Sequence, residues 1–139
     1  MTPSERREAG LPYVYNDKAI LDEQYQYQNE LEKYNRTMPS EHEKRAEMLS
    51  HLMAEVGENC TIDTPVHANW GLHNVHFGSN IYCNAMVSFV DDADIFIGDY
   101  CMIGPGTVFA TSFLPLFYFC YIYYLGLLIF CCQFVAISL

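Results

Sequence analysis

Hydrophobic residues follow two different periods along the chain, and the change falls near residue 60. Residues 18–34 are rich in Glu, Gln, Leu and Tyr, which predicts a first helix. Within 41–56 the apolar residues recur at steps of three and four and form one stripe: Leu49, Leu52, Met53 and Val56. The stripe predicts a second helix, and residues 1–58 are interpreted as an N-terminal helical segment.

The second predicted helix carries a signal at each end. Ser40 stands three residues before Glu43, the capping-box spacing at which the serine oxygen accepts from a first-turn amide while the glutamate reaches back. Gly57 follows the last apolar position, and glycine readily takes the left-handed conformation that ends many helices. Both signals predict a helix that runs from 41 to 56.

A period of six residues follows. Its leading positions form two series, Phe77, Cys83, Phe89 and Ile97, Ile103, Phe109. The second series is displaced by two residues, which indicates a small insertion within 91–94. A helix cannot repeat every six residues and a flat strand alternates every two, whereas short strands separated by turns in a parallel β-helix fit this period. Since three hexapeptides make one triangular coil, residues 59–112 are predicted to hold about two coils.

The repeat stops at Ser112, and residues 113–139 form an apolar tail. The tail contains no Asp, Glu, Lys or Arg, and it exceeds the ~20 residues that cross a bilayer as a helix. No Lys or Arg flanks either of its ends, so the usual signal for membrane orientation is missing. The predicted fold class is therefore mainly β with N-terminal helices, followed by an off-pattern apolar tail.

Charge and composition disfavour two classes of function, nucleic-acid binding and metal binding. The 7 basic and 17 acidic residues all lie between Glu5 and Asp99 and give a net charge of -10, so nucleic-acid binding is disfavoured. The six cysteines have no zinc-site spacing. His73 and His76 stand three apart in an expected extended segment, where they point to opposite faces, and no metal site is predicted. The N-terminus has no apolar signal segment, which predicts a cytoplasmic protein.

Two stretches, 68–92 and 97–112, resemble the maltose/galactoside O-acetyltransferase family of hexapeptide-repeat acyltransferases. Within the first, Tyr-x-Asn at 82–84 and Val-Asp-Asp at 90–92 carry the likeness. The helical front half is similar as well, at Arg-Glu-Ala-Gly (7–10), at the Pro-Ser helix start (39–40) and at Val-Gly-Glu-Asn (56–59). The resemblance covers residues 1–112, about four fifths of the chain.

The resemblance implies a left-handed parallel β-helix that forms a homotrimer, with active sites between subunits and acetyl transfer from acetyl-CoA to a sugar hydroxyl. The family's base is a His in an Ala-Thr-(Ser/Ala)-Gly-His-Pro segment. Ala110, Thr111 and Ser112 match it, but Phe113 replaces the Gly and Leu114 replaces the His. The later coils, which build most of the acetyl-CoA site in the family, do not follow. This chain is therefore expected to be catalytically impaired.

The resemblance also implies four substrate-binding positions. Asn84 matches an asparagine that binds the sugar, and Asp92 matches a carboxylate that contacts the acceptor. Asn69 corresponds to a further sugar contact, beside an extra residue within 72–74, and Asp17 to an N-terminal acceptor contact whose alignment can slip by two residues. The alternatives are that Asn84 only satisfies a turn of the coil and that Asp92 is a solvated acid.

Three hypotheses remain open on the sequence. The chain is a sugar O-acetyltransferase of this family, or a non-catalytic product with a foreign C-terminal tail. Alternatively it is a non-catalytic, tail-anchored membrane protein, in which 113–139 inserts into a bilayer and the acidic part faces the cytosol.

Overall fold

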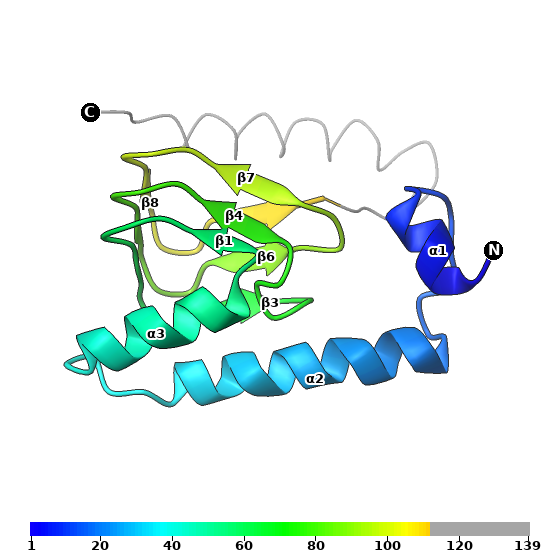
Figure 1. The fold of residues 1–139 in the computed structure, drawn as a ribbon, viewed down its shortest axis with the longest axis horizontal. Coiled ribbons are helices and arrows are strands. Elements are labelled where there is room, and N and C mark those ends of the chain that lie inside the picture. The colour runs from blue at the N-terminus through cyan, green and yellow to red at the C-terminus, as the bar shows by residue number, and fades with distance from the viewer. Residues whose placement is uncertain (112–139) are drawn as a thin grey trace.

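The computed structural model describes residues 1–111, in which three helices precede a stack of short strands (Figure 1). The helices are α1 (Pro3–Glu8), α2 (Lys18–Asn35) and α3 (His42–Leu52). The strands are β1 (Glu55–Val56), β2 (Thr61–Ile62), β3 (His67–Ala68), β4 (Val75–Phe77), β5 (Tyr82–Cys83), β6 (Ser88–Val90), β7 (Ile95–Ile97), β8 (Met102–Ile103) and β9 (Val108–Ala110).

The strands form three parallel sheets, with orders β1-β4-β7, β2-β5-β8 and β3-β6-β9. Every third strand therefore stacks on the strand one coil earlier, which makes the molecule a left-handed parallel β-helix with N-terminal helices and confirms the predicted fold class. Inward-facing partners lie in register in each sheet: Val56–Phe77–Ile97, Ile62–Cys83–Ile103 and Ala68–Phe89–Phe109.

The described residues hold three coils, so the prediction of about two coils is wrong. The missed first coil is the series Val56, Ile62 and Ala68, again six residues apart. It was hidden because its first member completes the apolar stripe of the preceding helix. The register confirms the two-residue insertion after β6. Phe77 pairs with Ile97, which is 20 residues later in the chain, whereas three hexapeptides would span 18 residues.

The first predicted helix is confirmed as α2, whereas the second one ends earlier than predicted. Helix α3 stops at Leu52, because Met53 is extended and the next residues pair with β4 as β1. The predicted capping box is also wrong: Glu41 is the N-cap residue and makes no side-chain cap bond.

Gly57 has a different role from the predicted helix stop. It lies where two coils approach each other, and an added Cβ would stand 2.5 Å from the carbonyl oxygen of Gly78. Glycine is needed here because the backbones of consecutive coils meet too closely for any side chain.

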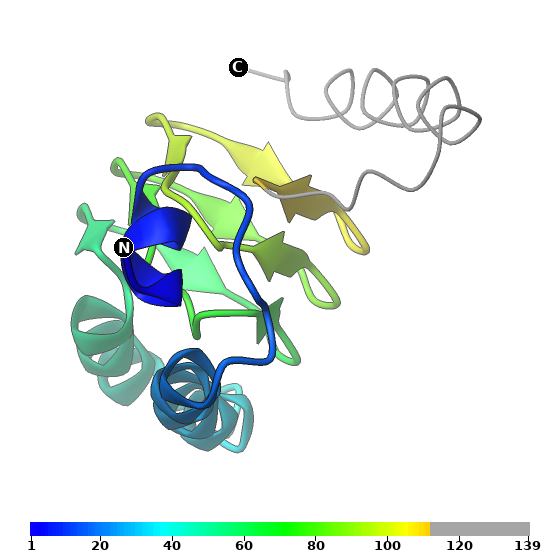
Figure 2. The same cartoon turned by 90° about the vertical axis from the view of Figure 1, so that its right-hand side faces the viewer.

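Helices α2 and α3 lie across the end of the stack formed by the first coil (Figures 1 and 2). The Tyr34 side chain of α2 is fully buried, and its hydroxyl donates to the carbonyl oxygen of Ile62 at 2.6 Å. Asn35 makes two bonds to the backbone of Val66, each 2.9 Å long. The helices thus satisfy backbone groups that an open end of the first coil would leave exposed.

Within residues 1–111, no helix is both long enough and apolar enough to cross a bilayer. Residues 113–139 lie outside the described residues, and the hypothesis of a membrane tail therefore stays a prediction.

We expect Tyr34→Phe to lower the free energy of unfolding by ~1–3 kcal/mol, because it leaves the buried Ile62 carbonyl without its donor. Tyr25→Phe on the same helix is the control, since Tyr25 is 54% exposed and its loss should change stability by less than ~0.5 kcal/mol. Urea unfolding can be followed by the fluorescence of Trp70, the only tryptophan of the chain. Equal stability of the two variants would contradict the role given to Tyr34.

Candidate acceptor-binding site

Two turns stack at one corner of the coil. Asn69 and Trp70 follow β3, and Asp91 and Asp92 follow β6. Because β3 and β6 pair in parallel, with Ala68 opposite Phe89, the second turn lies directly above the first. We call these four residues the acceptor corner, after the acceptor contact that the family resemblance implies for Asp92.

The Asp92 carboxylate is the centre of the acceptor corner. Its Oδ1 accepts from the indole Nε1 of Trp70 at 2.9 Å and from Nδ2 of Asn69 at 3.5 Å. Two of the predicted substrate-binding residues, Asn69 and Asp92, are therefore in contact although they are 23 positions apart. The carboxylate is half-buried and oriented by these donors, unlike a freely solvated surface acid.

Helix α1 contributes Arg7 to the same corner. The guanidinium carbon lies 3.9 Å from the centre of the Trp70 ring, and a guanidinium nitrogen donates to the Asp92 carbonyl oxygen at 3.2 Å. Trp70 is only 1% exposed, so its ring offers no surface on which a sugar can stack. The indole instead fixes the orientation of Asp92, and the cation over its face stabilises that arrangement.

Tyr13 also belongs to this neighbourhood, although the sequence did not single it out. Burial raises the pKa of its hydroxyl, the negative charge of Asp92 raises it further, and Arg7 lowers it. The net shift is upward, so the hydroxyl stays protonated at neutral pH and remains a hydrogen-bond donor beside the acid.

Asp91 lies in the same turn as Asp92 and was predicted only as part of the insertion within 91–94. It is fully buried, and its Oδ1 accepts from the Trp70 backbone N–H at 2.7 Å. Among the described residues its other carboxylate oxygen has no hydrogen-bond partner. Burial is the largest cause of the raised pKa of this carboxyl, which indicates that ionised Asp91 weakens the fold.

The other two predicted substrate-binding residues lie elsewhere. Asn84 follows β5 at a different corner of the coil, where its side-chain oxygen accepts from the Ala85 N–H at 2.8 Å. Asp17 is the N-cap residue of α2, and its carboxylate accepts from the backbone N–H groups of Ala19 and Ile20. Each residue therefore has a local structural role in the single chain.

The third layer of the acceptor corner begins at Thr111. The Thr111 N–H and hydroxyl both donate to the Val90 carbonyl oxygen, at 3.1 and 2.8 Å, and the hydroxyl accepts from Ala93. The chain thus leaves β9 at the corner that holds Asp92. Leu114, which the resemblance places at the family's histidine position, lies outside the described residues.

Residues 1–111 give little evidence for two other kinds of catalytic group, a bound metal ion and a cysteine nucleophile. No group of three or more His, Cys, Asp and Glu side chains in that range could hold a metal ion. Burial raises the pKa of the Cys83 thiol to about 12, so this cysteine is not a nucleophile at neutral pH.

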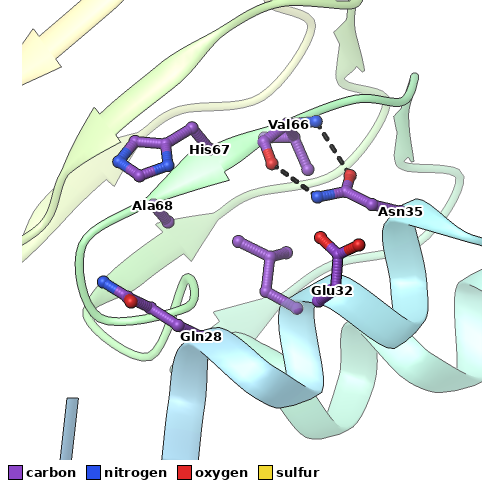
Figure 3. Close-up of a pocket in the computed structure, with 7 residues that line it drawn as sticks. Gln28, Glu32, Asn35, Val66, His67 and Ala68 are labelled. Carbon is purple, nitrogen blue, oxygen red and sulfur yellow. Dashed lines mark hydrogen bonds between the residues drawn. The ribbon is translucent and has the colours of Figure 1, made fainter. Parts of the chain in front are cut away.

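Beside the acceptor corner, a small groove opens between α2 and β3 (Figure 3). Two of its lining residues bond Asn69: Gln28 donates to its carbonyl oxygen at 2.9 Å, and His67 Nε2 lies 3.3 Å from its side-chain oxygen. The groove and the corner therefore share Asn69.

Comparison with known proteins agrees with this arrangement. The maltose acetyltransferase hexapeptide capping motif matches residues 6–57. The galactoside O-acetyltransferase of Lactococcus lactis is 42% identical over 103 residues, which cover 74% of this chain and 50% of the relative. That of Escherichia coli is 30% identical over 112 residues, covering 81% and 55%. The chain spans about half the length of the curated relatives it matches.

Solved structures show the same likeness. A galactoside acetyltransferase in complex with coenzyme A superposes with a TM-score of 0.77 at 30% identity, covering 85% of this chain and 58% of that one. A maltose O-acetyltransferase from Clostridium difficile 630 gives 0.78 at 29% identity, covering 85% and 63%. The predicted resemblance to the maltose/galactoside O-acetyltransferases, a family of hexapeptide-repeat acetyltransferases, is therefore confirmed. The expectation that this family uses acetyl-CoA as co-substrate is confirmed.

Asp91→Asn tests the anchor of the corner through its pH dependence. A carboxyl whose pKa is raised on folding favours the folded state while it is protonated, and this contribution is lost as the pH rises through the raised pKa. The wild-type chain should therefore lose more stability than Asp91→Asn as the pH rises from about 4, the ordinary pKa of an Asp carboxyl, to about 7.

Urea unfolding at both pH values measures the difference, and Asp94→Asn is the control, because Asp94 is exposed in the same turn. A stability difference between wild type and Asp91→Asn that is independent of pH would contradict the assignment.

Proposed function

We propose that the acceptor corner is the sugar-binding half of an O-acetyltransferase site. The observation that carries the proposal is the contact of Asn69 and Asp92, with the carboxylate held by Trp70. A carboxylate accepts hydrogen bonds from sugar hydroxyls, and bonds to a charged acceptor are stronger than neutral ones. Maltose, glucose or a galactoside is the proposed acceptor, in line with the names of the relatives.

We also propose that a complete sugar site forms between copies of the chain in a homotrimer. Asn84 and the acceptor corner occupy different corners of one coil, so a second copy is needed to bring an Asn84 side chain to Asp92. The outer face of β5 and β8 and the turn after β5 expose apolar side chains that suit such a contact: Tyr82 at 36%, Met102 at 54% and Met86 at 66%.

For acetyl transfer, the sugar hydroxyl must lose its proton as its oxygen attacks the thioester carbonyl of acetyl-CoA. A base at the family's histidine position takes that proton, whereas the aliphatic Leu114 side chain has no atom that accepts one. We therefore propose that the 139-residue chain binds an acceptor sugar without acetylating it at the family's rate.

Sugar binding should be visible in Trp70 fluorescence, because the indole N–H bonds the carboxylate that receives the sugar. Asp92→Asn keeps an oxygen for Trp70 but removes the charge, so maltose should bind about 10- to 100-fold more weakly. Asp94→Asn, which alters a neighbouring exposed acid paired with His76, should bind as the wild type does. Equal binding by both variants would show that the sugar does not contact Asp92.

Acetyl transfer should be absent from the purified 139-residue chain. With acetyl-CoA and maltose, glucose or a galactoside, we expect thiol release at the background rate, because the loss of a general base alone removes ~100- to 10,000-fold of the rate. A thiol-reactive dye measures the release. Sugar-dependent turnover at an ordinary enzymatic rate would contradict the role assigned to Leu114.

A further inference from the structure

The groove of Figure 3 has a size and a lining that suit a single sugar ring. It lies between α2 and β3 and has a volume of about 180 Å³. Pockets for drug-sized ligands span ~300–1,000 Å³, so this groove has room for one ring but not for a longer chain. Its lining includes the polar side chains of Gln28, Glu32 and His67.

The hydrogen bonds of Asn69 determine which nitrogen of the His67 ring carries a hydrogen. The ionised Asp92 carboxylate only accepts, so Asn69 must present its NH₂ group to Asp92 and its side-chain oxygen to His67. That oxygen also only accepts, which means that His67 Nε2 carries a hydrogen and donates it. In the neutral ring, Nδ1 is then an acceptor.

The other polar groups of the groove add acceptors. Gln28 uses its Nε2 to donate to the Asn69 carbonyl oxygen. Its side-chain oxygen is an acceptor that a sugar hydroxyl can use. The Glu32 carboxylate is exposed and accepts from Arg36 Nε through one oxygen, Oε1. A groove rich in acceptors is complementary to a ring of hydroxyl donors.

We propose that this groove is a subsite for the second ring of a disaccharide acceptor, with His67 as its main contact. The inference rests on the proposed function, because it places the reacting ring at Asp92. Asn69 connects the two positions: it bonds Asp92 on one side, and Gln28 and His67 of the groove on the other. A ring at Asp92 and a ring in the groove are thus neighbours along one hydrogen-bonded chain.

The test compares maltose with methyl α-glucoside, a single ring, by titration of Trp70 fluorescence in the 139-residue chain. The wild type should bind maltose more tightly than the single ring. His67→Ala should weaken maltose binding by roughly 2- to 12-fold, the range of one hydrogen bond, and leave the single ring unchanged. His67→Gln, which keeps a donor and an acceptor, should retain part of the preference.

His51→Ala is the matched control, because His51 is exposed in the last turn of α3. An unchanged Trp70 emission maximum and urea midpoint in His67→Ala would show that its fold is intact. If neither sugar titrates in the wild type, the proposed function fails and the subsite with it. If both sugars bind equally well in the wild type, or if His67→Ala weakens both equally, the subsite alone is refuted.

Discussion

Backbone hydrogen bonds between parallel strands run along the axis of the stack, so each coil lies in register with the one before it. This register places Ala68 opposite Phe89 in the core. It also sets the turns after β3 and β6 one above the other. Side chains that are more than twenty residues apart in the chain thereby meet at one corner, and the contact of Asn69 with Asp92 depends on it.

That register requires a covered first coil, and α2 provides much of the cover. The buried hydroxyl of Tyr34 and the amide of Asn35 bond backbone groups of the first coil, which would otherwise lie unpaired beneath a helix. Helix α2 also supplies Gln28, which holds the backbone of Asn69. The helical cap and the candidate site are therefore connected by the same helix, and a loss of the cap should disturb both.

The acceptor corner holds two acids in different surroundings. Asp92 is half-buried and has donors from Trp70 and Asn69, whereas the preceding Asp91 is buried with one oxygen unpaired among the described residues. Buried carboxylates weaken a fold unless they are fully bonded. Asp91 nevertheless accepts a hydrogen bond from the Trp70 backbone and so helps to position Trp70. The indole of Trp70 in turn donates to the Asp92 carboxylate. A residue that lowers the stability of the fold but positions a neighbouring side chain is typical of functional sites.

Much of this architecture was predictable from periodicity. The six-residue repeat gave the fold class and the insertion after β6, since both depend on side chains that face the core. The first coil was missed because Val56 fits a helical stripe as well as a strand, and only pairing with Phe77 decides between them. Gly57 was misassigned for the same reason, because its constraint comes from a neighbouring coil and not from its own helix.

The site was predictable only in part. Asp92 and Asn69 were found through the resemblance, whereas Arg7 and Asp91 were not assigned a role. Their roles depend on contacts across 85 and 21 positions, which no local pattern contains. Helix α1, which holds Arg7, is six residues long with no buried residue, and it has no amphipathic stripe to detect.

The central claim is that the chain keeps a sugar-binding corner built around Asp92. The most direct measurement is a ¹H–¹⁵N spectrum of the labelled 139-residue chain, recorded during a maltose titration. We predict that the indole signal of Trp70 and the side-chain amide signals of Asn69 shift together and saturate, while those of Asn59, in a distant turn, stay in place. Absence of these shifts at Trp70 and Asn69 at any maltose concentration would contradict the account.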